Sequence, residues 1–298
     1  MSEIAVIGAG AWGTAIAIAL GRGGAHRVRL WAYEKEVAES IRQRRTNEMY
    51  FPEFRLPDAV EATSQMERAL DGAEIAVSVM PSSHCRRIYQ QMAPHIVPEL
   101  ILVSATKGIE NHSLLRMTEV ATEVLRDAGK EARIGALSGP SFAKEVARGD
   151  PTAVAVAFGN QDLAHRVQKE FSDPVFRVYT NADVVGVEMG GALKNIIAIA
   201  AGVCDGLGLG HNTAAALIAR GLAEITRLAV ACGAHRETLF GLAGMGDLVL
   251  TCTGGLSRNR TVGVELGRGK SLDAIIAGMQ GAVAEGVPTV HSALGLAR

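Results

Sequence analysis

A lysine in the most apolar stretch of the chain is the first residue that could do chemistry. Lys194 is the only charged residue between Met189 and Cys204, a segment otherwise rich in Gly, Ala and Ile. Such a lysine must extend to water or find a partner, and partial burial lowers the pKa of an amine toward neutrality. That pKa suits the general base of an alcohol oxidation. The alternative is a lysine that reaches along its helix to water.

Small residues surround Lys194 on its expected helix. Gly190, Gly191 and Ala198 lie four and three residues before it and four residues after it. Residues at these spacings are neighbours on one helix face. We therefore expect room for a ligand beside the amine.

Two polar loops follow segments that have the composition of buried strands. Lys107 follows LILVSAT, and Ser138-Gly139-Pro140-Ser141 follows ARIGAL. Open α/β sheets bind ligands outside the carboxyl ends of their strands, so we expect both loops to face the same crevice. For Lys107 the alternative is a solvated lysine after a strand.

A third polar cluster lies between residues 244 and 260. Ser257 has the position of an N-cap for the helical segment TVGVELG. Arg258, Asn259 and the N–H groups of that first turn could hold an anion, because a guanidinium can bind phosphate oxygens in bidentate fashion. Asp247 could bond a substrate hydroxyl or orient a lysine. Each residue would also fit a plain cap or surface charge.

Three glycines near the N-terminus have the spacing of a dinucleotide-binding turn. Gly8, Gly10 and Gly13 follow the strand-like segment 3–8 and precede the helical segment TAIAIALGRG. In this motif the first glycine makes the turn, the second lets backbone approach a pyrophosphate and the third permits close helix packing. The following helix N-terminus offers N–H groups to the phosphate. The alternative is a structural turn without a phosphate.

The next expected strand should determine which dinucleotide binds. Glu34 lies 21 residues beyond Gly13, close to the position where an acid bonds the ribose 2′-hydroxyl of NAD. Lys35 and Arg45 could instead serve the 2′-phosphate of NADP. Glu34 would also fit the start of the next helix, so both cofactors stay open.

The elements that must position these residues change character near Thr180. Strand-like runs alternate with helical stretches before it, which predicts βαβ units and a doubly wound parallel sheet of Rossmann type. The segments after it have helical spacing alone. We expect a dinucleotide-binding domain over 1–180 and an all-α substrate-binding domain over 181–298. The expected strands are 3–8, 27–32, 74–80, 100–106, 132–138, 152–158 and 175–180.

Composition narrows the classes of partner. Thirty Lys and Arg against 31 Asp and Glu give a net charge of −1. The chain therefore has no excess of positive charge that would favour binding to nucleic acid. The four cysteines are scattered, the histidines form no HxxxH pair, and we expect no metal site and a cytoplasmic protein with reduced thiols. No uninterrupted apolar run reaches the roughly 20 residues of a membrane span. A small-molecule substrate remains, and a homodimer is left open.

Six motifs together resemble NAD(P)-dependent glycerol-3-phosphate dehydrogenase of the bacterial type. The resemblance implies a Rossmann domain, a helical substrate domain and an NAD(P)H cofactor. It also implies an oxidoreductase that reversibly reduces dihydroxyacetone phosphate to sn-glycerol 3-phosphate for phospholipid biosynthesis, a part of lipid metabolism. The motifs are Gly8–Thr14, Ala105–Gly108, Ser138–Glu145, Gly191–Asn195, Gly246–Leu248 and Ser257–Arg260.

The resemblance also implies residue roles. Lys194 would accept the proton of the C2 hydroxyl, Lys107 would polarise that oxygen and touch the nicotinamide, and Asp247 would complete the catalytic set. The implied substrate-binding residues are Lys107, Gly139, Ser141, Lys194, Asp247, Ser257, Arg258 and Asn259. The implied cofactor-binding residues are Gly8, Gly10, Ala11, Trp12, Gly13, Tyr33, Lys107, Ala143, Arg258, Val283 and Glu285.

Two departures from the family pattern matter. Many members carry Arg or His where this chain has Tyr33, which leaves the choice between NAD and NADP open. The family usually continues for about one more helix pair beyond VPTVHSALGLAR, so we expect a shorter helical domain. Two other functions stay open: another dehydrogenase of the β-hydroxyacid type, and a catalytically silent dinucleotide-binding sensor.

Overall fold

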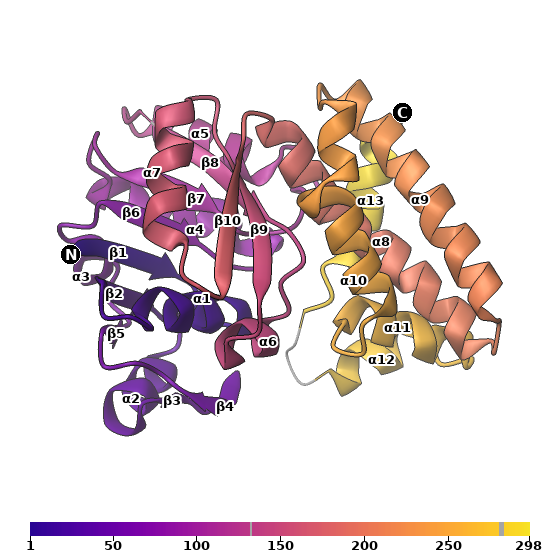
Figure 1. The fold of residues 1–298 in the computed structure, drawn as a ribbon, viewed down its shortest axis with the longest axis horizontal. Helices are drawn as coiled ribbons and strands as arrows, with labels where there is room; N and C mark the ends of the chain where they lie inside the picture. Colours follow the sequence, from indigo (N-terminus) through magenta and orange to yellow (C-terminus); the bar gives the residue numbers. More distant parts are fainter. Residues whose placement is uncertain (132, 280–282) are drawn as a thin grey trace. The chain divides into compact units, whose positions relative to one another are not determined.

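The structure is a computed structural model that describes residues 1–131, 133–279 and 283–298. The chain forms two compact units (Figure 1). The N-terminal unit comprises Met1–Thr106, Met117–Leu137 and Ser141–Ala182, and the C-terminal unit comprises Lys107–Arg116, Ser138–Pro140 and Asp183–Arg298. Two short loops from the first half of the sequence, which carry Lys107 and Gly139, therefore belong to the C-terminal unit.

An eight-stranded sheet forms the centre of the N-terminal unit, with the strand order β10-β9-β8-β7-β6-β1-β2-β5. Strand β1 pairs in parallel with β2 on one side and β6 on the other, so Ile4 lies opposite both Val28 and Ile75. The chain changes direction across the sheet at β1, which is where doubly wound sheets bind ligands. The strands are β1 (Ser2–Ile7), β2 (His26–Trp31), β5 (Val60–Thr63), β6 (Ile75–Ser78), β7 (Ile101–Ser104), β8 (Arg133–Ser138), β9 (Thr152–Ala157) and β10 (Phe176–Asn181).

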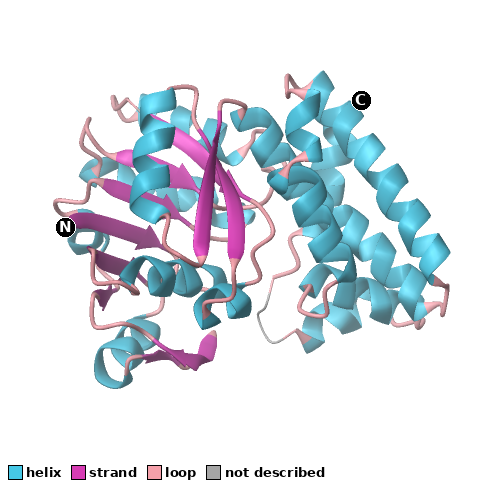
Figure 2. Ribbon diagram, in the orientation of Figure 1, coloured by secondary structure: helices cyan, strands magenta, loops and turns pink. Residues whose placement is uncertain are grey.

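Helices pack around this sheet (Figure 2). Helix α1 packs against α6, α4 against α5, and α7 against β10. Most of α1 is buried, which explains its almost uninterrupted apolar sequence. The helices are α1 (Ala11–Gly21), α2 (Lys35–Arg44), α3 (Met66–Leu70), α4 (Cys85–Met92), α5 (Met117–Asp127), α6 (Ala143–Arg148) and α7 (Gln161–Phe171), with short turns η1 (Ser82–His84) and η2 (Ala93–His95).

All seven expected strands are present, and the expected α/β class of the first domain is confirmed. Three strands were not expected: β5 at the sheet edge, and the antiparallel pair β3 (Thr46–Asn47) and β4 (Phe51–Arg55). Strand β5 has only four residues, one of them Glu61, so it lacks the apolar run of the central strands.

Helices make up the C-terminal unit from Asp183 onward in the described residues, which confirms the expected all-α domain. Helix α8 is its centre and packs against α9, α10, α11 and α13. The elements are α8 (Val184–Gly206), α9 (His211–Ala231), α10 (Asp247–Thr253), α11 (Arg258–Gly267), α12 (Leu272–Gly278) and α13 (Gly286–Leu296), with a 3-10 turn η3 (Arg236–Phe240) and a π turn η4 (Leu242–Gly246).

Glycines let α8 and α11 cross closely. A Cβ on Gly202 would meet the carbonyl of Arg260, and a Cβ on Gly263 would meet the carbonyl of Ile199. By length and composition α8 could cross a membrane, but 67% of its apolar window is buried within the fold. That pattern is also the one expected of a core helix in a helical domain.

Candidate active site

Asp247 joins two lysines that lie far apart in the sequence. Its Oδ2 accepts a hydrogen bond from Lys107 Nζ at 2.7 Å, and its Oδ1 accepts one from Lys194 Nζ at 2.5 Å. Lys107 follows β7, Lys194 lies on α8 and Asp247 is the first residue of α10. The C-terminal unit thus brings together the three residues that the motifs suggested for catalysis.

Lys194 is buried and has partners on α10. Its side chain also donates to Thr251 Oγ1 at 2.8 Å, and the residue is only 6% exposed. Burial lowers the pKa of its amine to about 7, opposed by Asp247 and helped by the positive charge of Lys107. The alternative of a lysine reaching water along its helix is therefore wrong. Near neutral pH this amine can both hold and release a proton.

The charge on Asp247 is maintained by the two amines. The residue is 1% exposed, and burial alone would raise the pKa of its carboxyl. Lys107 and Lys194 outweigh burial and hold this pKa below its usual value. One carboxylate faces two amines, so the second ammonium charge is uncompensated. Loss of a proton from Lys194 removes that excess charge.

Lys107 also connects the two loops that follow β7 and β8. Its Nζ donates to the carbonyl of Gly139 at 3.1 Å. Only 17% of its side chain is exposed, so the alternative of a solvated lysine is wrong. The expected proximity of these two loops is confirmed by this hydrogen bond.

The expected ligand space beside Gly190 and Gly191 is filled by protein. A Cβ on Gly190 would meet the carbonyl of Ala243, and a Cβ on Gly191 would meet Ser138 Oγ. The small residues allow close packing of neighbouring backbone and side chains against α8. A substrate must therefore approach Lys194 from another direction.

In the Ser257–Asn259 cluster, two side chains form hydrogen bonds within the protein and the third is exposed. Ser257 Oγ accepts a hydrogen bond from the N–H of Arg260 at 3.2 Å, which confirms the expected N-cap of α11. Asn259 is buried, with its amide donating to Asn195 Oδ1 and its carbonyl oxygen accepting from the N–H of Gly286, both at 2.9 Å. Arg258 is exposed at the start of α11 and can reach an anion.

The glycine-rich turn after β1 has the expected geometry. Gly8 adopts φ +121°, and a Cβ there would meet the carbonyl of Val79, while a Cβ on Gly13 would meet the carbonyl of Gly8. A Cβ on Gly10 would meet nothing within 4 Å, so this backbone stays open to approach. Helix α1 then begins at Ala11 without a side-chain cap or an acid in its first turn.

These features fit the pyrophosphate of a dinucleotide. The open backbone and uncapped helix N-terminus supply N–H donors and a positive dipole end. The indole N–H of Trp12 is buried without a hydrogen-bond partner in the described parts of the chain. A bound polar ligand would satisfy such a donor.

Two of the charged residues that follow β2 have partners within the protein. Glu34 precedes α2, as its alternative role required, and accepts a hydrogen bond from Tyr50 Oη at 2.9 Å. Arg45, which could have served a phosphate, donates instead to the carbonyls of Val60, at 2.8 Å, and of Pro57. Its backbone is left-handed at the end of α2.

The remaining expected residues are spread over the structure. Ser141 and Ala143 belong to the N-terminal unit at the start of α6, whereas Gly139 belongs to the C-terminal unit. Val283 is half-buried before α13. Glu285 lies at the start of α13. Burial lowers the pKa of Arg258, and the negative charge of Glu285 opposes this by favouring the charged guanidinium.

Sequence reasoning missed Thr251 and Arg87. Thr251 lies one helical turn after Asp247, so the i to i+4 spacing on α10 could have indicated it. Arg87 contacts Tyr33 from α4, and no local pattern connects these distant positions.

Metal and thiol chemistry find no support in the described residues. These contain no group of three or more His, Cys, Asp or Glu side chains that could hold a metal ion. Cys252 lies near Lys194, but burial raises the pKa of its thiol to about 12. The thiol therefore stays protonated and is a poor nucleophile.

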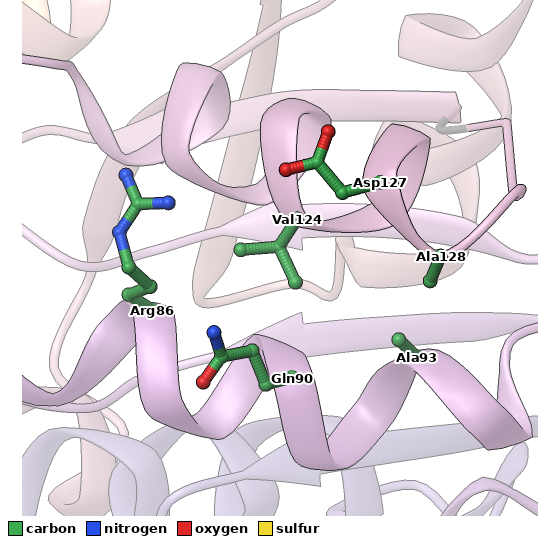
Figure 3. A pocket seen from close by; sticks show the side chains of 6 residues that line it. All are labelled: Arg86, Gln90, Ala93, Val124, Asp127 and Ala128. Atoms are coloured by element: carbon green, nitrogen blue, oxygen red, sulfur yellow. The ribbon is translucent and has the colours of Figure 1, made fainter.

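A surface pocket of about 240 Å³ lies between α4 and α5 (Figure 3). It includes none of the residues expected in the active site. Arg86, at one end of it, donates to Glu123 at 3.2 Å, so its charge is already partnered. The six lining residues are Arg86, Gln90, Ala93, Val124, Asp127 and Ala128.

Fold and site together define the class of protein. A Rossmann-type sheet with a glycine-rich turn after its first strand binds a dinucleotide, and a buried lysine with a pKa of about 7 can exchange the proton of an alcohol. This combination is that of an NAD(P)-dependent oxidoreductase acting on a hydroxyl or carbonyl group.

Comparison with known proteins gives the family. Residues 3–164 match the model of the NAD-dependent glycerol-3-phosphate dehydrogenase N-terminus, and residues 183–298 match that of the C-terminus. The chain belongs to the NAD-dependent glycerol-3-phosphate dehydrogenase family. The resemblance drawn from the six motifs is therefore confirmed.

Individual relatives agree with this assignment. A Koribacter versatilis protein named glycerol-3-phosphate dehydrogenase (NAD(P)+) is 66% identical over 297 residues, which cover 100% of this chain and 88% of the relative. The crystal structure of glycerol-3-phosphate dehydrogenase from Coxiella burnetii has a TM-score of 0.93 at 39% identity, covering 99% of this chain and 89% of that one. A ketopantoate reductase from Ralstonia eutropha, at 18% identity and a TM-score of 0.60 over 99% of this chain and 98% of that one, shares the fold alone.

Proposed function

We propose that this chain is an NAD(P)-dependent glycerol-3-phosphate dehydrogenase that interconverts dihydroxyacetone phosphate and sn-glycerol 3-phosphate. Family membership and the relatives' names support the substrate and the cofactor. The observation that carries the chemistry is the buried Lys194, with a pKa of about 7 and its amine held by Asp247. The product would serve phospholipid synthesis, as the family resemblance implies.

The lysine pair supplies the proton chemistry at C2. In the oxidation direction the neutral amine of Lys194 accepts the proton of the C2 hydroxyl, and in the reduction direction its ammonium form returns it. Lys107, as an ammonium, hydrogen-bonds the same oxygen and stabilises negative charge there. Asp247 and Thr251 fix the position of the Lys194 amine. When bound, NAD(P) supplies the acceptor or donor of the C2 hydride.

The phosphate of the substrate is carried by the carbon next to C2 and takes no part in the hydride transfer, so it can serve as a binding group. Arg258 is the exposed cation at the start of α11, where helix N–H groups also favour an anion. We include Gly139, Ser141, Ser257 and Asn259 in this site from their motif positions. Binding energy from the phosphate orients C2 against the lysine pair.

The proposal assigns the cofactor mainly to residues 1–180, with Arg258, Val283 and Glu285 from the second domain, and the substrate to residues 181–298 together with Lys107, Gly139 and Ser141. The cofactor set remains Gly8, Gly10, Ala11, Trp12, Gly13, Tyr33, Lys107, Ala143, Arg258, Val283 and Glu285. A cytoplasmic location and a homodimer complete the proposal. No role in nucleic-acid or membrane binding is proposed.

The testing experiment is oxidation of NADH and NADPH by this chain with dihydroxyacetone phosphate, followed at the nicotinamide absorbance. Turnover with at least one cofactor is expected. Binding of both cofactors without turnover would contradict the proposal and favour a silent sensor. Turnover with a β-hydroxy acid and none with glycerol 3-phosphate would favour the other dehydrogenase type, which family membership does not support.

A further inference from the structure

An arginine from α4 lies against Tyr33, two residues after the end of β2. The guanidinium carbon of Arg87 is 5.1 Å from the ring centroid of Tyr33, and its Nη1 donates to Tyr33 Oη at 3.4 Å. Tyr33 is 57% exposed and contacts Trp31 edge to face, with ring centroids 6.2 Å apart. The Tyr33 ring thus packs against Trp31 of β2 on one side and contacts the Arg87 guanidinium as well.

The end of β2 is where a Rossmann sheet distinguishes two cofactors. An acid there bonds the ribose 2′-hydroxyl of NAD, and a nearby arginine accommodates the 2′-phosphate of NADP. Tyr33 and Glu34 occupy this position, two and three residues after Trp31, the last residue of β2. Arg87 is the cation that the tertiary structure adds to them.

The charges nearby leave Arg87 available to a phosphate. Within the described residues, no carboxylate lies within salt-bridge distance of Arg87, and a guanidinium stacked on a ring keeps most of its N–H donors at its edge. Glu34, the acid that would oppose a phosphate, already accepts the hydroxyl of Tyr50. Arg45 is committed to backbone carbonyls and cannot serve instead.

We propose that Arg87, held over the Tyr33 ring, binds the 2′-phosphate of NADPH and lets this chain use NADPH as well as NADH. The inference rests on the dinucleotide site of the proposed function. Glu34 remains at the same position to receive the 2′-hydroxyl of NADH. A tyrosine at position 33 therefore does not remove the cation that NADPH needs, because α4 supplies it.

The test compares binding of the two cofactors to the full chain and to Arg87→Ala, measured by nicotinamide fluorescence or calorimetry. Loss of one charge-assisted contact should weaken NADPH binding by about 10- to 100-fold and NADH binding by less than about 3-fold. Arg87→Lys should give an intermediate NADPH affinity, because it keeps the charge and loses the planar fork. Adenosine 2′,5′-bisphosphate against 5′-AMP should show the same selectivity.

Arg86→Ala is the matched control. It removes the same charge from the preceding position on α4, but Arg86 is paired with Glu123. It should change the affinity for both cofactors by less than about 3-fold. Unchanged NADPH binding in Arg87→Ala, or an equal loss for NADH and NADPH, would overturn the inference. These affinities are measured without substrate, so a failure of the proposed reaction would show separately as absent turnover of dihydroxyacetone phosphate.

Discussion

At the scale of single residues, the lysine pair determines the proton chemistry. Replacing Lys194 by alanine removes the group that holds the C2 proton while Asp247 keeps Lys107 as a partner. We expect turnover to fall at least about 100-fold, the scale of losing a general base, with NADH affinity little changed. Steady-state kinetics and a binding titration check this, with Lys270→Ala, at the surface, as control. Turnover within 10-fold of the parent chain would show that Lys194 is not the general base.

The pKa of Lys194 also predicts a pH profile. Oxidation of glycerol 3-phosphate needs the neutral amine, so kcat/KM should rise with pH and level off above about 7. Lys107 lowers this pKa, so Lys107→Met should move the rising limb to higher pH, besides slowing the reaction. Initial rates at several pH values give the pH at which kcat/KM rises. An unshifted limb in the variant would show that Lys107 does not act on this proton.

Arg258 tests the phosphate assignment. Its replacement by alanine should weaken binding of dihydroxyacetone phosphate by about 2 kcal/mol or more, since a charge-assisted contact is lost. The KM of the phosphate substrate and inhibition by inorganic phosphate are the measurements. Unchanged values of KM and kcat would contradict the assignment. Arg268→Ala, which removes a surface partner of Glu265, is the control.

At the scale of elements, the close crossing of α8 and α11 predicts a stability effect. Gly263→Ala would place a Cβ against the carbonyl of Ile199, so α11 must move away from α8. We expect a loss of about 1–3 kcal/mol in the free energy of unfolding, the range for overpacked cores. Chemical denaturation measures it. Gly278→Ala, where a Cβ would meet nothing within 4 Å, should cost nothing. Equal stability of both variants would contradict the packing argument.

Some elements of the fold could be predicted from the sequence and others could not. Central strands such as β1 are buried on both faces, so their apolar runs identify them, and the glycine spacing after β1 identifies the turn. Short β5 and the polar pair β3–β4 lack such a signal. Lys194 stood out because it is charged in an apolar helix. The space beside Gly191 was misjudged because the same absence of a side chain serves packing against Ser138.

Tertiary contacts explain the rest of the site. Arg87 and Tyr33 are far apart in the sequence, and their contact becomes visible only in the folded chain. The same holds for Lys107, which belongs to the C-terminal unit and forms an ion pair with Asp247 there. Family motifs named Lys107 and Asp247, but the carboxylate bridge between the two lysines became visible only in the structure.

At the scale of the whole molecule, the two units have separate cores, and the proposed cofactor residues lie mainly in the first unit and the proposed substrate residues mainly in the second. NADH alone should therefore protect the segment around Gly8–Gly13 and the end of β2 from amide hydrogen exchange. Glycerol 3-phosphate should instead protect the starts of α10 and α11. Mass action predicts about 2.7 kcal/mol of stabilisation at a ligand concentration 100 times Kd. Exchange mass spectrometry with each ligand, and with both, distinguishes the two patterns. Protection of α11 and not of the glycine-rich turn by NADH would reverse the assignment of ligands to units.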